Sequence, residues 1–196
     1  HTSGVPDSLA TRAVIGFGDR GGDGWSQLRG FQYPQLWRNV HWRTGIFAVS
    51  ASFLLLANAA SGYMLLMAGW LGLLALALGH NARLDRQLAD TDRRPMAPSE
   101  LTTHTAATAA IAVVCCLPLV LAAYDGDSRA FLLSYLVVAT TATALTLVAA
   151  APPAATIMFS VVKAVFAAAC GLVLGEYVAA VAAIAIAPAS GIGSGE

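Results

Sequence analysis

The sequence predicts an all-α fold, a polytopic transmembrane helical bundle of about six spans. Hydrophobic residues make up 57% of the 196 residues, and the mean hydropathy is +0.67. Charged residues make up 11%, whereas a soluble domain usually has about 25%. The charges also gather in short stretches between long uncharged runs, as in chains that cross a bilayer several times. The net charge of zero argues against nucleic acid as a partner, because nucleic acid binding needs a basic face.

Residues 1–43 are predicted to form a polar and amphipathic N-terminal segment on the membrane surface. The stretch FQYPQLWRNVHWR, residues 31–43, interleaves aromatic and basic side chains. Aromatic rings prefer the headgroup level of a bilayer, and arginines extend toward it. The same residue types are frequent at the centres of protein interfaces. We therefore expect contacts with lipid or with a partner subunit through Trp37, Arg38, Trp42 and Arg43.

Residues 44–188 are predicted to form the transmembrane domain, followed by a flexible tail at 189–196. The first uncharged run, residues 44–79, would be ~54 Å long as one helix, and the bilayer core is only ~30 Å thick. Two spans with a turn near residues 58–63 fit better, because Asn, Ser and Gly there favour a turn.

The remaining spans follow from the same pattern. Residues 80–104 are predicted to form a charged loop, and residues 124–129 a short polar turn. Pro118 is expected to kink the third span, because proline removes one helical hydrogen bond. Residues 154–187 favour two spans, with five in total if this run is one long helix. The predicted spans after the loop are 105–123, 130–150 and the run 154–187.

Arginine-rich segments predict the orientation. The N-terminal segment has five arginines and the 80–104 loop has four, and basic residues on short loops mark the cytoplasm-like side. With six spans, the N-terminus, the 80–104 loop with Arg94, and the C-terminus are all expected on that side.

The loop also carries a pattern of a known family. Residues 80–101 read HNARLDRQLADTDRRPMAPSEL, in which Asn81 and Asp85 lie four residues and about one helical turn apart. Arg94 and Pro95 follow. This pattern resembles the motif at the end of the second helix of UbiA-type membrane prenyltransferases, and the resemblance covers residues 45–125.

The resemblance implies that the motif holds magnesium against a prenyl diphosphate, because Mg²⁺ takes hard oxygen ligands. Mg²⁺ is expected as a cofactor only on this interpretation. Ala82 and Ala89 stand where the family has acidic residues, and the chain is shorter than that family's fold, so an inactive relative is the variant of this hypothesis. The candidate metal ligands are Asn81, Asp85, Asp90 and Asp92.

A simpler interpretation is that the same stretch is a solvent-exposed turn between two spans. An inner loop is expected to be rich in arginine. Its acidic and basic side chains then neutralise one another in water, where each exposed pair contributes ~0–1 kcal/mol. The side chains concerned are Asp85, Arg86, Asp90, Asp92, Arg93 and Arg94.

Lys163 is expected near the middle of its span. A charge there costs ~2.5–3.5 kcal/mol, so we expect Lys163 to contact a partner subunit, to reach lipid headgroups or to line a polar path. The cysteines lie in apolar runs without zinc-ligand spacing and are expected to be packing residues. All four histidines are expected at chain ends or in loops, away from a mid-span haem position. The cysteines are Cys115, Cys116 and Cys170, and the histidines are His1, His41, His80 and His104.

The sequence contains no P-loop, HExxH or Ser-His-Asp motif. The predicted function is therefore a non-catalytic, integral accessory subunit of a larger membrane complex, which binds membrane lipids and neighbouring membrane subunits and contacts a lipid or an unspecified cofactor. The alternatives are a UbiA-like prenyltransferase or its inactive relative, and a membrane sensor or transporter domain.

Overall fold

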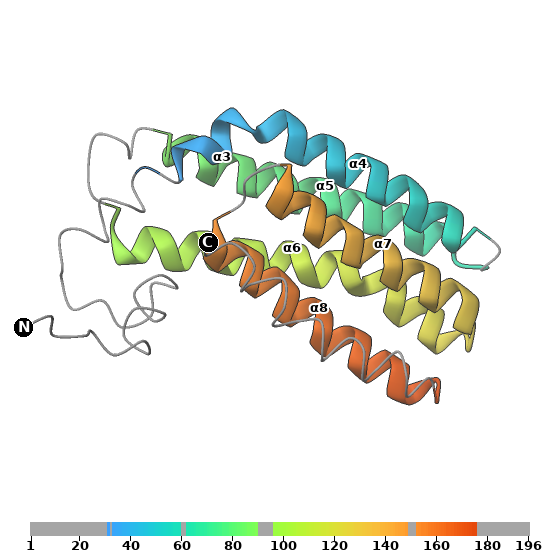
Figure 1. Cartoon of the computed structure of the whole chain (residues 1–196). Coiled ribbons are helices and arrows are strands. Elements are labelled where there is room, and N and C mark those ends of the chain that lie inside the picture. The colour runs from blue at the N-terminus through green and yellow to red at the C-terminus, as the bar shows by residue number, and fades with distance from the viewer. Residues whose placement is uncertain (1–30, 32, 60–61, 90–95, 149–151, 176–196) are drawn as a thin grey trace, which may run out of the picture.

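The computed structural model describes residues 31, 33–59, 62–89, 96–148 and 152–175. Within these ranges all regular elements are helices, arranged as a bundle (Figure 1). The short α3 precedes five long helices. Their bounds are α3 Pro34–Arg38, α4 Val40–Ala57, α5 Met64–Gln87, α6 Pro98–Tyr124, α7 Ser128–Leu147 and α8 Pro153–Val173.

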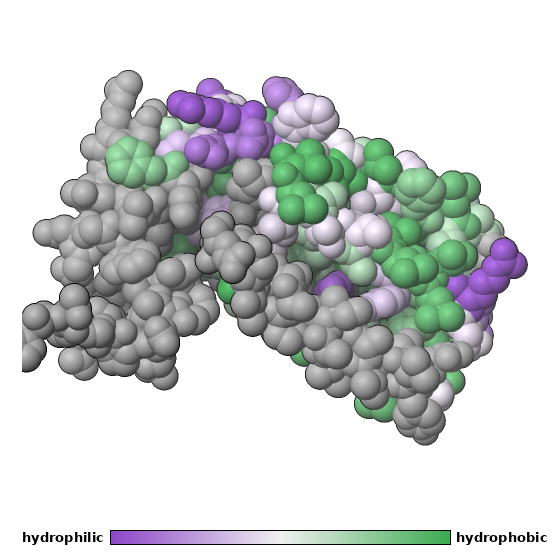
Figure 2. Space-filling model, viewed as in Figure 1, coloured by the Kyte–Doolittle hydropathy of each residue, from purple (hydrophilic) through white to green (hydrophobic). Residues whose placement is uncertain are grey.

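The five long helices are suited to a membrane. Each is long and apolar enough to cross one, and their 18 to 27 residues correspond to ~27–41 Å at ~1.5 Å per residue. Large apolar side chains point outward, with Leu65 90% exposed and Leu76 73% exposed. Figure 2 shows hydrophobic surface over the middle of the bundle and hydrophilic surface toward its ends. The predicted all-α transmembrane fold is confirmed.

The long helices run alternately up and down, joined by short connections (Figure 1). The first residues of α4, α6 and α8 therefore lie at the same end of the bundle as the last residues of α5 and α7. We call this the site end. α6 is the central helix and packs against α5, α7 and α8, while α4 packs mainly against α7.

Small side chains let α6 and α8 approach closely. Ala112, Cys116 and Ala167 are at most 1% exposed and belong to the main hydrophobic core. Between membrane helices, where lipid removes the hydrophobic driving force, close van der Waals contact of small residues holds the helices together. The three cysteines are free and buried, as packing residues are expected to be.

The predicted turn between the first two spans is confirmed. α4 ends at Ala57 and α5 begins at Met64. Asn58 is 2% exposed, and its side-chain Nδ2 donates to the carbonyl of Leu54 at 2.9 Å and lies 3.1 Å from Oγ of Ser134 in α7. The amide thus satisfies a carbonyl at the end of α4 and ties that end to α7.

Asp127 caps α7. Its Oδ1 accepts hydrogen bonds from the backbone N–H groups of Arg129 and Ala130, both at 2.9 Å, and so satisfies two of the donors that have no partner at a helix start. Gly126, with φ of +71°, supplies the left-handed turn that lets α6 reverse into α7.

We expect Asp127→Ala to lower the free energy of unfolding by ~1 kcal/mol, because an alanine at this position leaves these N–H groups without an acceptor. Reversible unfolding by dodecyl sulfate in mixed micelles measures the change. Asp125→Ala is the matched control, since Asp125 is exposed in the same turn. Equal effects of the two substitutions would contradict the assignment of the cap.

The helix ends differ from the predicted boundaries at the charged loop and at the first span. The 80–104 loop was predicted too long, because α5 continues to Gln87 and α6 begins at Pro98. The transmembrane domain was expected from residue 44, but α4 already begins at Val40. α8 ends at Val173, close to the predicted division of the 154–187 run. A sixth span, the tail and residues 1–30 lie outside the described residues.

Candidate functional site

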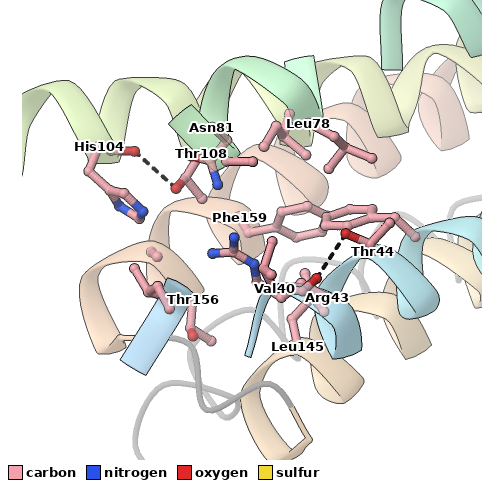
Figure 3. A pocket seen from close by; sticks show the side chains of 16 residues that line it. Val40, Arg43, Thr44, Leu78, Asn81, His104, Thr108, Leu145, Thr156 and Phe159 are labelled. Atoms are coloured by element: carbon pink, nitrogen blue, oxygen red, sulfur yellow. Dashed lines mark hydrogen bonds between the residues drawn. The ribbon is translucent and has the colours of Figure 1, made fainter. Parts of the chain in front are cut away.

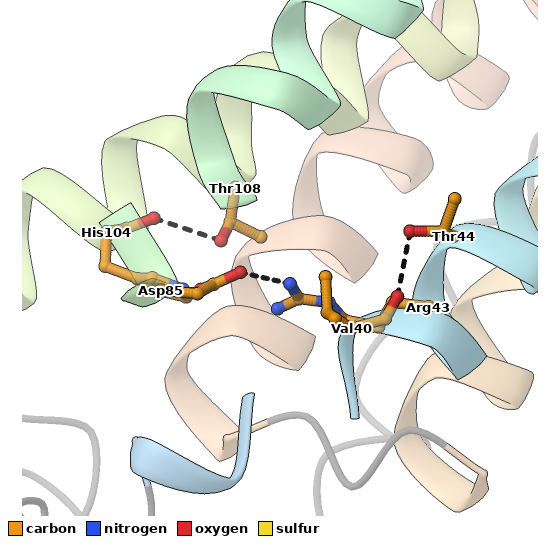
Figure 4. Close-up of polar contacts among 6 residues, drawn as sticks. All are labelled: Val40, Arg43, Thr44, Asp85, His104 and Thr108. Carbon is orange, nitrogen blue, oxygen red and sulfur yellow. Dashed lines mark hydrogen bonds and ion pairs between the residues drawn. The ribbon is translucent and has the colours of Figure 1, made fainter. Parts of the chain in front are cut away.

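A buried ionic cluster joins three helices at the site end. Arg43 lies in the first turn of α4, Asp85 in the last turn of α5, and His104 in the second turn of α6. Asp85 is fully buried, and Arg43 and His104 are 9% and 2% exposed. Figure 4 shows Asp85 between the other two side chains.

Asp85 accepts from both neighbours. Its Oδ2 is hydrogen-bonded to Nη2 of Arg43 in an ion pair, and its Oδ1 lies 3.1 Å from Nε2 of His104. An ionised carboxylate has no proton to donate, so Nε2 of His104 carries the proton in this bond. The charge of Arg43 is thereby compensated inside the bundle, as a buried charge requires.

A small apolar cluster holds this arrangement from the side of α3. Tyr33 and Leu36 are 1% exposed and pack with Leu88, Met96 and Leu101. The edge of the Tyr33 ring meets the His104 ring, with centroids 5.1 Å apart and planes at 87°, a favourable aromatic geometry. Tyr33, the residue before α3, thus holds the His104 ring from this side, and a position of residues 1–43 on the membrane surface stays a prediction.

A cavity of about 60 Å³ adjoins the cluster (Figure 3). Each of the five long helices contributes to its wall. The Arg43 guanidinium and the Asn81 amide line one part of it, and most of the wall is apolar. The apolar lining includes Val40, Phe47, Leu78, Ile111, Leu145 and Phe159.

Asn81 and His104 both line the cavity, and each has a polar atom without a hydrogen-bond partner among the described residues. Asn81 is 7% exposed, and the atoms concerned are its buried Oδ1 and Nδ1 of His104. Buried polar atoms normally have partners, and one without a partner calls for an explanation such as a ligand or a water. The site end therefore has unused hydrogen-bonding capacity.

Three threonines add acceptors to the cavity wall. Each donates its hydroxyl proton to its own helix, from Thr44 to the carbonyl of Val40 at 2.8 Å, from Thr108 to that of His104 at 3.0 Å, and from Thr156 to that of Pro152 at 3.3 Å. Their oxygens therefore retain lone pairs that can accept from a ligand.

The structure corrects the predicted environment of Asp85 and Arg43. Asp85 was interpreted as a solvated loop residue balanced by its neighbours, but it is buried and bound to Arg43 and His104. Arg43 was expected at lipid headgroups or a partner. It faces Asp85 instead, because the carboxylate compensates its charge more locally than headgroups could. His104 was expected at a chain end or in a loop but lies within α6, as His41 and His80 lie within α4 and α5.

The metal interpretation fits the described residues poorly. Both oxygens of Asp85 are engaged by Arg43 and His104, so Mg²⁺ would compete with the charge of Arg43 for this carboxylate. Among the described residues, no three His, Cys, Asp or Glu side chains group as a metal site. Asn81 lines the cavity. Asp90 and Asp92 lie outside the described ranges, as does Arg94.

The predicted contact residues of α3 and α4 lie near the site end. Trp42 is 64% exposed, and Trp37 is 37% exposed. The guanidinium carbon of Arg86 lies 5.9 Å from the centroid of the Trp37 ring, within range of a cation–π interaction. Arg38 is also exposed. Contacts of these side chains with lipid or a partner stay predictions.

Lys163 lies near the middle of α8, as the sequence predicts, and its contact with a partner subunit, lipid headgroups or a polar path stays a prediction. It is 2% exposed, so a lipid or partner contact would require the side chain to leave the interior. Among the described residues no carboxylate forms an ion pair with it; the ion pairs there join Asp85 to Arg43 and to His104.

The sequence did not indicate His104, Tyr33 or the threonines as site residues. One signal was available, since Arg43 and His104 each stand directly before a predicted span, on the same side as Asp85. Which of them meet depends on how the helices pack, and spacing along one chain does not contain that information.

Comparison of the chain with protein-family models, with curated proteins and with solved structures finds no match. The resemblance to UbiA-type prenyltransferases therefore rests on its own residues alone.

Proposed function

We propose that this chain is a non-catalytic membrane subunit that binds one amphipathic small molecule in the cavity at the site end. The observation that carries the proposal is the cavity itself, which combines an apolar wall with the Arg43 guanidinium and an unsatisfied Asn81 amide. Small-molecule sites typically pair a mostly apolar lining with a few fixed polar groups.

The cavity also reaches the bundle surface. Thr44 lines the cavity and is exposed on α4, so a tail longer than the cavity can continue along the outside of the helices. That outer surface is apolar across the middle of the bundle (Figure 2). An amphipathic molecule dissolved in the bilayer therefore fits the site better than a fully polar solute does.

The ionisable side chains are arranged to hold one another. Asp85 is bound to both Arg43 and His104, so its carboxylate is engaged, while Nδ1 of His104 has no partner among the described residues and keeps a lone pair that can accept a hydrogen bond from a ligand. The groups act as positioning residues that hold the guanidinium beside the cavity.

The assembly role rests on the exposed aromatic and basic residues near the site end, Trp42 and Arg38 among them. Tryptophan and arginine are enriched at protein interfaces. The described basic residues of α3, α4 and the end of α5 lie at the site end, and we propose that this end faces the cytoplasm-like side.

We expect a bound molecule to co-purify with the chain in mild detergent and to be lost in Asn81→Leu, because leucine removes the unsatisfied amide and fills the polar part of the cavity. Organic extraction of the purified protein followed by mass spectrometry measures it. Asn58→Leu is the matched control, since Asn58 is a buried asparagine at the opposite end. Equal recovery from all three proteins would contradict a site at Asn81.

A UbiA-like activity is the second candidate, favoured by Asn81, which lines the cavity, with Asp85 about one turn further along α5. Magnesium-dependent binding of a prenyl diphosphate that Asp85→Asn abolishes would support it. Absence of such binding at millimolar magnesium would remove it.

A further inference from the structure

We infer that the head which the cavity accepts is a neutral hydroxyl group, so that the ligand is a long-chain alcohol. This inference rests on the binding function proposed above and names its ligand class. It is carried by the charge, hydrogen-bonding groups and size of the cavity.

Charge excludes an anionic head. The positive charge nearest to the cavity belongs to Arg43, and Asp85 already compensates it through a buried ion pair. A phosphate or carboxylate head would bring a second negative charge next to Asp85, which is unfavourable at a site with little water. A neutral head meets no such repulsion.

The hydrogen-bonding groups favour a hydroxyl over an ether or a hydrocarbon. The cavity offers guanidinium N–H donors on Arg43, and Figure 3 shows this group among the lining side chains. It also offers acceptors, in Oδ1 of Asn81 and in the lone pairs of Thr44 and Thr108. A hydroxyl both accepts and donates one hydrogen bond, so it satisfies both kinds of group at once.

The volume of the cavity determines how much of the ligand it can enclose. A water needs ~10–15 Å³ of such volume, so the cavity of about 60 Å³ holds a head and the first few methylene groups. Phe47 and Phe159, whose ring centroids are 6.5 Å apart, form part of the apolar wall against which these methylenes pack. The remaining tail leaves on the side of Thr44 and lies in the bilayer.

The test uses the full chain in phosphatidylcholine nanodiscs with tritiated 1-hexadecanol as the probe. Unlabelled hexadecyl methyl ether and hexadecyl phosphate compete, because they share the tail and differ in the head. We expect each to bind about tenfold or more weakly than 1-hexadecanol. The ether lacks the hydroxyl donor and so loses one hydrogen bond to a buried group, and the phosphate brings a negative charge next to Asp85. Binding of the phosphate or the ether as tight as that of the alcohol would overturn the inference and leave the binding function standing.

Binding of none of the three compounds would overturn the proposed function together with the inference. The two failures are therefore distinguishable in one experiment.

Asp85→Asn supplies a second, independent readout. Without the carboxylate, Arg43 lacks its counter-ion, and we expect hexadecyl phosphate to gain about tenfold or more in affinity relative to the alcohol. Replacing both residues, Arg43→Gln with Asp85→Asn, removes the charge and should remove this gain. Asp125→Asn makes the same change at an exposed position and should bind like the unsubstituted chain. Unchanged selectivity in Asp85→Asn would contradict the role of charge compensation. The competition experiment in the unsubstituted chain does not depend on this variant.

Discussion

Replacing Asp85 with alanine is expected to lower the free energy of unfolding by about 3–5 kcal/mol, the effect of removing one partner of a buried ion pair. The carboxylate is fully buried and accepts from Arg43 and His104. Its removal leaves the arginine charge inside the bundle without a counter-ion. It also separates α4 from α5 and α6 at the site end, so the cavity should lose its polar groups as well.

Unfolding by dodecyl sulfate in mixed micelles, followed by circular dichroism, measures this loss. The informative control is the double variant Arg43→Met with Asp85→Leu, which removes both charges. It should recover most of the lost stability, because well-packed apolar residues often replace a buried ion pair without cost. A change below ~1 kcal/mol in Asp85→Ala would show that the ion pair is not buried as described.

Replacing Trp70 with phenylalanine is expected to cost about 1–3 kcal/mol, the penalty for leaving a buried carbonyl without a partner. Pro118 lies within α6 and is buried. Because proline has no backbone N–H, the carbonyl of Val114 four residues earlier lacks its usual helical donor. The indole Nε1 of Trp70 on α5 donates to this carbonyl at 2.7 Å and takes the place of that donor.

A double-mutant cycle with Pro118→Ala separates this hydrogen bond from ring packing. Alanine at 118 restores the helical donor, so Trp70→Phe should then cost only the lost ring volume. We expect a coupling free energy of ~1 kcal/mol or more between the two sites, within the range observed for residues that share a partner. Additive effects would mean that the indole does not serve the carbonyl that the proline leaves free.

The ion pair of Asp85 and the indole hydrogen bond of Trp70 join helices at different levels of the bundle. The ion pair binds α4 to α5 and α6 at the site end, whereas the indole contact binds α5 to α6 nearer to their middle. Both supply hydrogen-bond partners from within the protein, because the bilayer core has no water to pair with buried polar groups. Beside the cavity, Oδ1 of Asn81 and Nδ1 of His104 have no partner among the described residues, and this contrast is the reason why we assign the ligand there.

Hydropathy and the placement of charges alone predict that this protein lies in lipid and where most of its helices run. Uncharged runs set against the bilayer thickness predicted the first two spans and the turn at residues 58–63, and the α6 to α7 turn lies where the polar residues indicated. Helix ends at the charged loop were predicted poorly. Hydropathy counts charges and cannot tell a solvated charge from one that is neutralised by a residue on another helix.

The roles of the polar residues, in contrast, depend on how the helices pack. The sequence selected Arg43 and Asp85 as separate surface features, and 42 positions separate them. The start of α4 lies against the end of α5, which itself packs on α6, and this arrangement brings Arg43 and Asp85 together with His104 beside the cavity. The physical reason is that the periodicity of the sequence determines which face of a helix is apolar. The partner of a buried polar group depends instead on the relative placement of several helices. That placement results from side-chain packing along the whole bundle.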